Sequence, residues 1–365
     1  MTIYAVADVH IANHRAHGGP VIGGLNNRAT QLIKLLRDAF AQTTPGDHFV
    51  VLGDLFDHHA PIPALLRATQ EALTEPGCGH PWVIPGNHDQ SSDKVWDNAC
   101  SPLWVADCVE QPRIIVDGNT AALMVPFGAP VYEVLRDALR DVENTRMFTA
   151  WKHAEYRLLL GHFGISDPND PPFMRDARDA IDWDTLAELC LEQNVQAVGA
   201  GNWHLQKFFR KEVDGRSVEG IQTGALAPTG WDNPGWRGYG GLVHWDSETG
   251  TWETMSCNGP RFIRHTPTEE ELHTYRNCSI YARVDAPPSE VEEKRAELEA
   301  LPLAGYEIRT VDPAAQKAAE DAAAAVRTVE LLGEALGRYV SEMPLPEGVT
   351  RQELLAAAKS YLPGV

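Results

Sequence analysis

The stretch Ile3-Tyr-Ala-Val-Ala-Asp-Val-His10 decides the fold of this chain, because it is a short apolar run that ends in polar side chains. Further short apolar runs have the same form, and each ends at or just before a glycine or a polar residue. Such runs, rich in β-branched and apolar residues, are typical of buried strands. They are Phe49–Leu52, Trp82–Ile84, Arg157–Leu160 and Val195–Val198.

Segments with helical periodicity separate these strands, namely Arg28–Gln42, Ile62–Leu73 and Trp183–Gln193. Alternating strands and helices predict an α/β fold in which helices cover buried sheets. In open α/β sheets, ligands bind beyond the carboxyl ends of the strands. The polar residues of this chain follow its strands at those ends, so we expect the functional site there.

The pattern changes between about Lys207 and Thr254, where hairpins replace the alternation of strand and helix. Asp214-Gly215 is a tight-turn signal between Lys207–Val213 and the run that starts at Arg216. A second pair of strands flanks the turn at 247–250. These strands predict a second sheet and therefore a β-sandwich flanked by helices.

A domain boundary is expected near residues 260–267, which gives a catalytic domain at 1–260 and a small α/β cap domain at 261–365. Within the cap, 279–284 and 306–311 read as strands. Ser289 and Glu292 have the spacing of a capping box for a helix over 289–300. Two amphipathic helices are expected at 326–340 and 351–362, and the Ala-rich segment 314–325 is either helix or linker.

The composition is that of an ordinary soluble globular protein of 365 residues, with 43% hydrophobic and 22% charged residues. The sequence has no apolar run long enough to span a bilayer, and its first residues lack the basic start of a signal peptide. Its 6 cysteines form no CxxC pair, which predicts reduced thiols and a cytoplasmic location. A net charge of −20 argues against strong non-specific nucleic-acid binding by this chain alone.

The polar blocks after the strands supply metal ligands. Asp8 and His10 are two residues apart, and in extended backbone that offset points both side chains to the same side. The Asp54 carboxylate can bridge two cations, and Asn87 adds an amide oxygen. Two imidazoles complete the set, from His162 and His204. Mixed oxygen and nitrogen ligands suit manganese, iron or zinc better than calcium or copper(I).

Two divalent ions at this edge would generate a nucleophile from water and clamp a phosphate ester. His88, next to Asn87, is placed to protonate the leaving oxygen, with Asp89 or Asp57 orienting its ring. Each block alone has an ordinary explanation: a chance Asp-x-His, a strand followed by a turn, an Asn-Gly turn, or a core histidine. Their order, with each block after an apolar strand, favours a metallophosphoesterase.

Together the blocks resemble those of the calcineurin-like metallophosphoesterases. The matching residues are Asp8-x-His10, Gly53-Asp54-x-x-Asp57, Gly86-Asn87-His88-Asp89, Gly161-His162 and Gly201-x-x-His204. The resemblance implies that Asp8, His10, Asp54 and His204 hold one metal. It also implies that Asp54, Asn87, His162 and position 202 hold the other.

The last block departs from the family pattern GHxH, because Asn202 replaces its first histidine. An amide oxygen binds a borderline metal more weakly than imidazole does. The second site is therefore expected to be loose, or selective for a harder ion such as manganese or magnesium, or partly empty. Alternatively Asn202 does not bind a metal, and water takes its place.

The sequence around 53–61 is also similar to SbcD-type nucleases, as is the order of Gly201-x-x-His-Leu-Gln206, Gln222–Leu226 and Gly240–Val243. This resemblance implies a bacterial or phage exo- or endonuclease of DNA repair and recombination that binds DNA. It implies two divalent ions, with manganese first and magnesium, iron or zinc as alternatives. It also implies a homodimer partnered by an SbcC-like ABC ATPase, and no membrane.

Four further residues are candidate DNA contacts: Lys207 and Arg210 for phosphates, and Trp231 and Trp236 for stacking on bases. The plain alternatives are a solvated hairpin face and packed loop anchors. Two other functions remain open. One is a phosphomonoesterase or small-molecule or nucleotide phosphodiesterase, which the acidic composition favours. The other is a metal-depleted, non-catalytic subunit, which Asn202 suggests.

Overall fold

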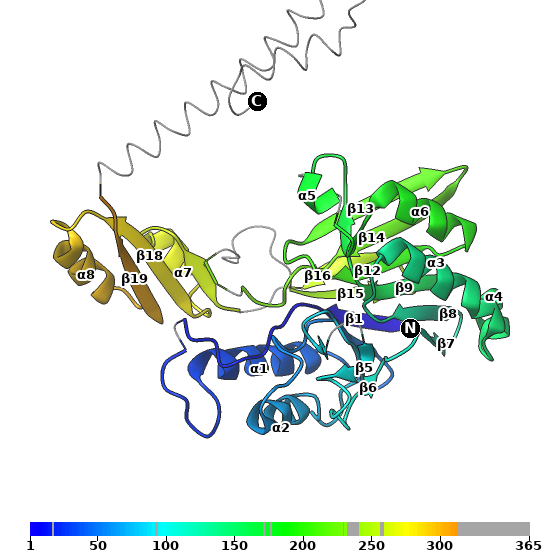
Figure 1. The fold of residues 1–365 in the computed structure, drawn as a ribbon, viewed down its shortest axis with the longest axis horizontal. Coiled ribbons are helices and arrows are strands. Elements are labelled where there is room, and N and C mark those ends of the chain that lie inside the picture. Colours follow the sequence, from blue (N-terminus) through cyan, green and yellow to red (C-terminus); the bar gives the residue numbers. More distant parts are fainter. Residues whose placement is uncertain are drawn as a thin grey trace, which may run out of the picture. The chain divides into compact units, whose positions relative to one another are not determined.

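The computed structural model describes residues 1–16, 18–91, 94–170, 172–175, 177–228, 230–231, 241–255 and 259–312. The helices expected at 326–340 and 351–362 and the segment 314–325 lie outside these ranges. The described chain is a mixed α/β fold with two large sheets flanked by helices, which confirms the predicted fold class (Figure 1).

The first sheet has the strand order β16-β15-β1-β2-β3-β6. Its centre is parallel, because β1 pairs with β2 and β2 with β3 in the same direction. The sheet ends in the antiparallel pair β15–β16 on one side and in β6 on the other. Its strands are β1 (Thr2–Val6), β2 (His48–Leu52), β3 (His80–Ile84), β6 (Asp107–Cys108), β15 (Leu242–Asp246) and β16 (Thr251–Met255).

The second sheet has the order β13-β14-β12-β9-β8-β7. Its centre is also parallel, and the strand at each of its edges is antiparallel. The predicted hairpin is present, and both of its turn residues, Asp214 and Gly215, have positive φ angles. The strands are β7 (Arg113–Asp117), β8 (Thr120–Val125), β9 (Tyr156–His162), β12 (Ala197–Gly201), β13 (Lys207–Val213) and β14 (Arg216–Gln222).

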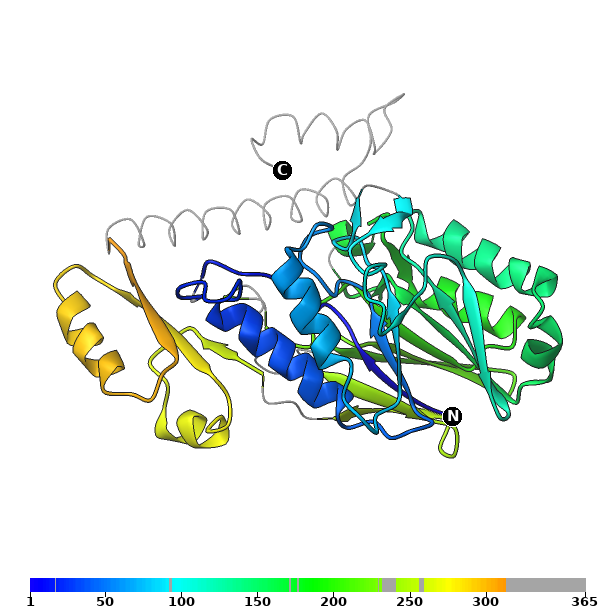
Figure 2. The same ribbon diagram turned by 90° about the horizontal axis from the view of Figure 1, so that it is seen from below.

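Three buried apolar clusters show that the layers run helix, sheet, sheet, helix. One cluster fills the space between the sheets, with Leu52 from β2 and Leu160 from β9 among its members. A second packs α1 (Asn27–Phe40) and α2 (Pro63–Ala72) against the outer face of the first sheet. Both views place these two helices next to each other on that face (Figures 1 and 2).

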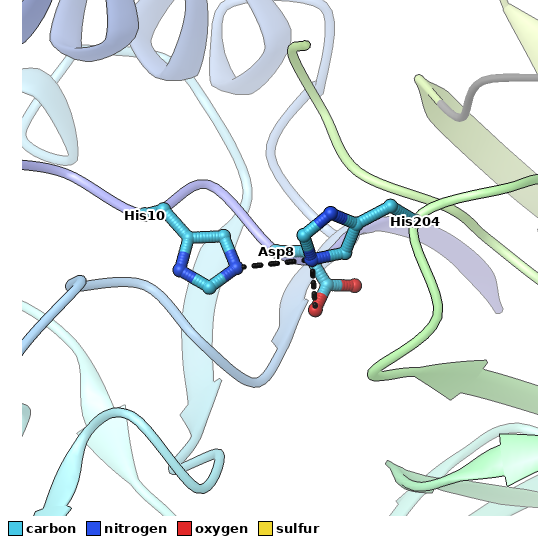
Figure 3. Close-up of side chains that lie close together, drawn as sticks. All are labelled: Asp8, His10 and His204. Atoms are coloured by element: carbon cyan, nitrogen blue, oxygen red, sulfur yellow. Dashed lines mark hydrogen bonds and ion pairs between the residues drawn. The ribbon is translucent and has the colours of Figure 1, made fainter. Parts of the chain in front are cut away.

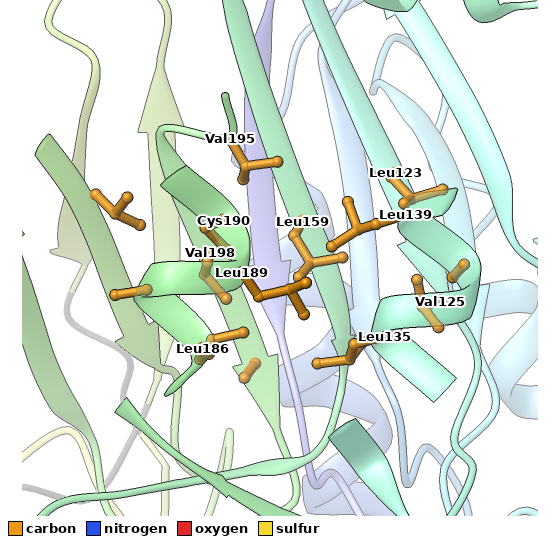
Figure 4. Packing of buried hydrophobic residues seen from close by; sticks show 14 of the residues in the cluster. Leu123, Val125, Leu135, Leu139, Leu159, Leu186, Leu189, Cys190, Val195 and Val198 are labelled. Atoms are coloured by element: carbon orange, nitrogen blue, oxygen red, sulfur yellow. The ribbon is translucent and has the colours of Figure 1, made fainter. Parts of the chain in front are cut away.

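The third cluster packs helices against the outer face of the second sheet. Leu135 and Leu139 of α3 (Val131–Asp141) and Leu186 of α6 (Trp183–Glu192) meet residues such as Leu159 on β9 (Figure 4). Their packing fixes the strands whose carboxyl ends carry the polar blocks. The remaining elements before residue 255 are β4 (Gln90–Ser91), β5 (Lys94–Asn98), η1 (Val142–Asn144), α4 (Phe148–His153), β10 (Gly164–Ser166), α5 (Pro172–Arg175) and β11 (Ala180–Asp182).

The described residues divide into two compact units, one of Met1–Ala282 with Pro302–Tyr306 and one of Arg283–Leu301 with 307–312. A three-stranded sheet in the order β17-β18-β19 follows the sandwich in sequence. The elements here are β17 (Arg261–Ile263), α7 (Glu269–Thr274), β18 (Ile280–Ala286), α8 (Val291–Glu299) and β19 (Gly305–Thr310). The division at 260/261 into catalytic and cap domains stays a prediction.

The predicted capping box at Ser289 is wrong. Helix α8 begins at Val291 with Glu290 as its N-cap, and no side chain caps it. The backbone N–H of Glu290 donates to Pro287 O in a turn, which delays the helix past Ser289. A true capping box occurs instead at α7, where the side chains of Thr268 and Glu271 each accept from the other's backbone N–H.

None of the helices in the described part of the chain combines the length and the apolarity that crossing a bilayer requires.

Candidate metal centre

The polar blocks meet at the carboxyl edge of the two parallel sheet centres. Ligand atoms of Asp8, His10 and His204 all lie within 4.8 Å of one another, and so do those of Asp8, Asp54 and His162. These residues come from the ends of four strands, β1, β2, β9 and β12. The convergence predicted from the strand ends is therefore present.

The first cluster joins the start of the chain to the fifth block (Figure 3). The Nε2 atoms of His10 and His204 lie 3.2 Å apart, and His204 Nε2 lies 3.8 Å from Asp8 Oδ1. His10 Nδ1 faces Asp57 Oδ1 at 3.2 Å. A proton on Nδ1 suits that carboxylate, which leaves the lone pair of His10 Nε2 directed at the centre of the cluster.

The second cluster is built around His162. Its Nδ1 lies 2.7 Å from the backbone oxygen of Leu52, which can only accept, so Nδ1 carries the proton. Its Nε2 then faces Asn87 Oδ1 at 2.9 Å and Asp54 Oδ2 at 3.4 Å. The same Asp54 oxygen lies 3.9 Å from His10 Nε2. Asp54 thus stands between the two clusters, as a bridging carboxylate must.

Asp8 and His10 do not converge for the reason expected from an extended backbone. Their φ angles are 51° and 50°, and that of Asp54 is 51°, all in the left-handed region. Non-glycine residues rarely adopt this conformation, and it concentrates at functional sites. Backbone hydrogen bonds hold it, since Asp8 N donates to Gly53 O at 3.1 Å and His10 N to Asp54 O at 3.0 Å.

Glycines leave the space that the ligands occupy. A Cβ on Gly53 would collide with the ring of His162, and one on Gly86 would collide with the carboxylate and backbone of Asp54. A Cβ on Gly201 would collide with the backbone oxygen of Leu52. The glycines of these blocks therefore serve close packing around the ligands.

Asn202 is anchored by a residue that no sequence pattern indicated. Its Nδ2 donates to the backbone oxygen of Asp179 at 3.2 Å and to Asp179 Oδ2 at 3.1 Å. Its backbone N–H donates to Asp8 Oδ2 at 3.1 Å, and its φ angle is 89°. Asp179 follows the loop after β10 and belongs to no motif, so only the folded chain identifies it.

His88 lies beside the first cluster. Its Nδ1 is 3.1 Å from the backbone oxygen of Asp57, so that nitrogen is the donor and Nε2 is the atom left to exchange a proton. Its ring meets the His10 ring edge to face, with centroids 4.8 Å apart. Asp57 orients His88 through its backbone oxygen, while its carboxylate faces His10 and, at 3.3 Å, His58.

Asp89 has a different task from the predicted one. Its buried carboxylate accepts the backbone N–H groups of Leu55, Phe56 and Gly86 at 2.8–3.1 Å. It therefore ties the loop after β3 to the loop after β2 rather than orienting the His88 ring. Burial, with a contribution from the Asp54 charge, raises the pKa of Asp89 to about 6.

The pKa values of the buried groups are set by the balance between burial and the charges of their neighbours. Burial works against a charged His162, but the facing Asp54 carboxylate raises the pKa of His162 to about 9. Burial likewise opposes ionisation of Asp54, yet His162 lowers the Asp54 pKa well below its usual range. For Asp8, burial dominates and raises the pKa. The centre therefore favours positive charge between its carboxylates and imidazoles.

The residues present fit a pair of divalent cations. Asp8 Oδ1 is buried without a hydrogen-bond donor among the described residues, which is costly unless a cation satisfies it. His162 Nε2 and Asn87 Oδ1, both acceptors when the ring is neutral, point at each other. Hydrogen-bond acceptors that are directed at one point can serve as metal ligands. With Asp54 shared between the two clusters, they match the ligand set of a dinuclear site.

Three of the four predicted DNA contacts interact with other residues of the chain. Lys207 binds the carboxylates of Asp167 and Asp170, and Arg210 Nη1 donates to Glu219 Oε1 at 3.0 Å. The Trp231 side chain is 8% exposed and packs on Phe262, so it anchors its loop and is not available for base stacking. Trp236 lies outside the described residues.

Comparison with known proteins gives the same family. Residues 1–206 match the Calcineurin-like phosphoesterase family. No curated protein sequence matches the chain.

Among solved structures, a purple acid phosphatase from yellow lupin is 12% identical and covers 70% of this chain and 52% of its own, with a TM-score of 0.43. A candidate 5′-nucleotidase from Staphylococcus aureus is 13% identical and covers 75% and 57%, with a TM-score of 0.41. A 5′-nucleotidase precursor from Thermus thermophilus is 14% identical and covers 69% and 53%, with a TM-score of 0.37. The chain spans little more than half the length of these proteins.

The matched segment holds all the metal-ligand candidates, from Asp8 to His204, and covers more than half of the chain. The Asp and His clusters fit the dinuclear centre of a hydrolase. The chain belongs to the calcineurin-like phosphoesterase family.

Proposed function

We propose that this chain is a metal-dependent phosphoesterase that cleaves phosphodiester bonds in DNA, as an SbcD-like nuclease. The observation that carries the hydrolytic part is the pair of clusters that share Asp8 and meet at Asp54. The nuclease part is supported by the sequence after the fifth block, where Gln222–Leu226 and Gly240–Val243 resemble SbcD proteins. In the structure β14 ends at Gln222 and β15 begins at Leu242, so both segments lie at strand ends.

In this proposal Asp8, His10, Asp54 and His204 hold one cation. Asp54, Asn87 and His162 hold the other, together with Asn202 through its Oδ1. Divalent cations bound there would polarise the phosphate and lower the pKa of water, so that water attacks at neutral pH. The ligand set contains both carboxylate or amide oxygens and imidazoles, so we expect manganese, with magnesium, iron or zinc as alternatives.

The protein's own groups supply the proton chemistry. Asp57 O holds the Nδ1 proton of His88, so a second proton on Nε2 is the one that can pass to the leaving oxygen. Asp57 also faces His10 Nδ1, and this contact directs His10 Nε2 inward. Asp89 holds the loops that carry Asp54 and Asn87 in register. We therefore assign proton transfer to His88 and positioning to Asp57 and Asp89.

An acidic chain needs help to hold DNA. The net charge is −20, and the salt bridges of Lys207 and Arg210 reduce the positive charge that the predicted contact face presents. We propose that the protein forms a homodimer and that an SbcC-like ABC ATPase partner supplies further contacts to DNA. We place this complex in the cytoplasm. The region after residue 260 would then serve as a DNA-binding cap.

The same ion pairs favour a second candidate function, the hydrolysis of small phosphomonoesters or nucleotide diesters. A small substrate needs only the metal centre and its immediate surroundings, so an acidic surface would not hinder it. This reading requires no partner.

A substrate panel separates the two candidates. The full chain would be loaded with manganese and given linear duplex DNA, single-stranded DNA, nucleoside monophosphates and a chromogenic diester. The nuclease proposal predicts that DNA is cleaved and that turnover disappears in Asp54→Asn. Hydrolysis of the monophosphates with intact DNA would reject the nuclease and support the second candidate.

A further inference from the structure

A cavity of about 710 Å³ opens beside the metal centre and shares Asn202 and His204 with it. Its volume lies in the range of small-molecule binding sites. Apolar side chains make up much of the wall, contributed by Ile165, Met174, Trp203 and Leu205. A group in this cavity would therefore lie next to a phosphate held at the metal centre.

The indole of Trp203 is held in place by the same loops that carry the ligands. Trp203 stands between Asn202 and His204 in sequence, and its ring packs on the backbone of Gly164, two residues after His162. A Cβ on Gly164 would collide with indole atoms Cε2 and Nε1, so only glycine leaves room for the ring in this position. The aromatic surface is preorganised, which reduces the entropic cost of stacking a ligand on it.

The polar groups of the cavity wall already have partners. Gln222 accepts from Ile165 N at 2.9 Å and donates to Ala200 O at 3.1 Å. Gln206 accepts from the Thr254 hydroxyl at 2.9 Å and donates to Thr223 O at 3.3 Å. The remaining wall therefore favours a planar, largely apolar group.

The charged groups beside the cavity disfavour an anionic occupant. Lys207 is bound by two carboxylates, those of Asp167 and Asp170, so this group of three side chains carries one net negative charge. A second phosphate would be repelled there, whereas an uncharged group would not.

We propose that this cavity binds the nucleobase of the nucleotide whose phosphate lies at the metal centre, with the base stacked on Trp203. The proposal rests on the proposed function, because it assigns a nucleic-acid substrate to the same centre. The proposal also predicts which forms of DNA are cleaved. A base enters the cavity only after leaving its stack, so frayed ends and single strands are cleaved in preference to an intact duplex.

The test compares two chromogenic diesters with the same leaving group, thymidine 5′-(p-nitrophenyl phosphate) and methyl p-nitrophenyl phosphate, on the manganese-loaded full chain. The measured quantity is the ratio of kcat/KM for the nucleoside ester to that for the methyl ester. Loss of one stacked base lowers this ratio about 5- to 150-fold in Trp203→Ala. Trp203→Phe keeps an aromatic face and retains most of the ratio.

Two exposed residues of the same hairpin region give a matched pair of variants. Leu205 is 61% exposed and lines the cavity, whereas Phe208 is 54% exposed and lies outside its lining. Leu205→Glu lowers the ratio even if Trp203→Ala fails to fold, and Phe208→Ala leaves it unchanged. An unchanged ratio in Leu205→Glu and Trp203→Ala, or an equal fall in Phe208→Ala, would overturn the proposal.

Binding of thymidine, measured by calorimetry with the manganese-loaded protein, separates this proposal from the nuclease proposal. If the protein hydrolyses neither ester, the nuclease proposal is rejected. Thymidine binding that is lost in Trp203→Ala would still support the cavity assignment in that case. Absence of thymidine binding by the unmodified chain would overturn it.

An oligonucleotide with an abasic terminal residue identifies the source of the base. Slower cleavage than that of the normal oligonucleotide indicates a DNA terminus, and equal cleavage together with inhibition of ester hydrolysis by thymidine indicates a free nucleotide.

Discussion

The side chain of Asn202 is held by Asp179, which accepts from its amide through both a backbone oxygen and a carboxylate oxygen, at 3.2 and 3.1 Å. Both partners are acceptors, so the amide nitrogen must be the atom that faces them. Oδ1 is then the atom of Asn202 left for a cation. In the proposed second metal site, position 202 therefore offers an oxygen where the family pattern has an imidazole nitrogen.

Asn202→His should tighten the second metal. An imidazole nitrogen is a stronger ligand than an amide oxygen for manganese, iron or zinc. The measurement is the stoichiometry and affinity of manganese by titration calorimetry. The left-handed backbone at position 202, with φ of 89°, adds a stability cost of about 1–3 kcal/mol for histidine.

Asp179→Ala is the companion variant. It releases the amide of Asn202 and should weaken manganese binding at the second site alone. Unchanged stoichiometry and affinity in both variants would mean that position 202 points elsewhere.

His88→Ala should lower turnover by roughly 10²–10⁴-fold, since it removes the proton donor for the leaving oxygen. Its ring lies beside the first cluster but Nδ1 is committed to Asp57 O, so metal content should persist. Turnover and elemental analysis are measured on the same preparation, with His153→Ala, an exposed change on α4, as the control. Loss of both metals in His88→Ala would contradict the assigned role.

Gly53→Ala should displace His162 and weaken the second metal site. A methyl group there collides with the imidazole, and the φ angle of 93° adds backbone strain. Gly46 offers a matched control, because its φ angle is 101° and no atom lies within 4 Å of a Cβ placed on it. Gly46→Ala should cost about 1–3 kcal/mol of stability and leave metal binding intact. Equal metal affinities in the two variants would count against the packing role of Gly53.

The α7 capping box predicts a pH dependence of stability. Partial burial opposes the charged form of Glu271, but the Thr268 N–H and His265 outweigh it and lower the Glu271 pKa. A lowered pKa in the folded state adds stability above the unfolded pKa of about 4.5, and this stability disappears as the pH falls through the folded value. The difference in unfolding free energy between the unmodified chain and Glu271→Gln, measured by urea denaturation, should therefore be largest at pH 6 and shrink steadily as the pH is lowered past the unfolded pKa of Glu271. A constant difference across that range would be inconsistent with this contact.

The strand ends were predictable because apolar runs and the glycines after them are local features. The strand predicted over Phe49–Leu52 is β2, and the predicted hairpin is β13–β14. The β7–β8 hairpin and α3 were not predicted, and their packing on the second sheet is visible only in the fold. The cap predicted at Ser289 failed because a local turn delayed the helix, while the true capping box at Thr268 has the same sequence pattern.

The metal ligands were predictable as residue types but not in their geometry. Asp8 and His10 converge through left-handed backbone, which an argument from extended strands cannot foresee. Asp179, Asp167 and Asp170 belong to no motif, and they act only because folding brings them to Asn202 and Lys207. The sequence alone suggested Lys207 as a phosphate contact because it could not show those carboxylates.

The most direct test is a crystal structure of the full chain grown with manganese, with anomalous scattering used to locate the ions. The account predicts two manganese peaks about 3.5–4 Å apart, with Asp54 bound to both. One ion should also be bound by Asp8, His10 and His204, and the other by Asn87 and His162. A single ion, or two ions without a shared Asp54, would contradict it.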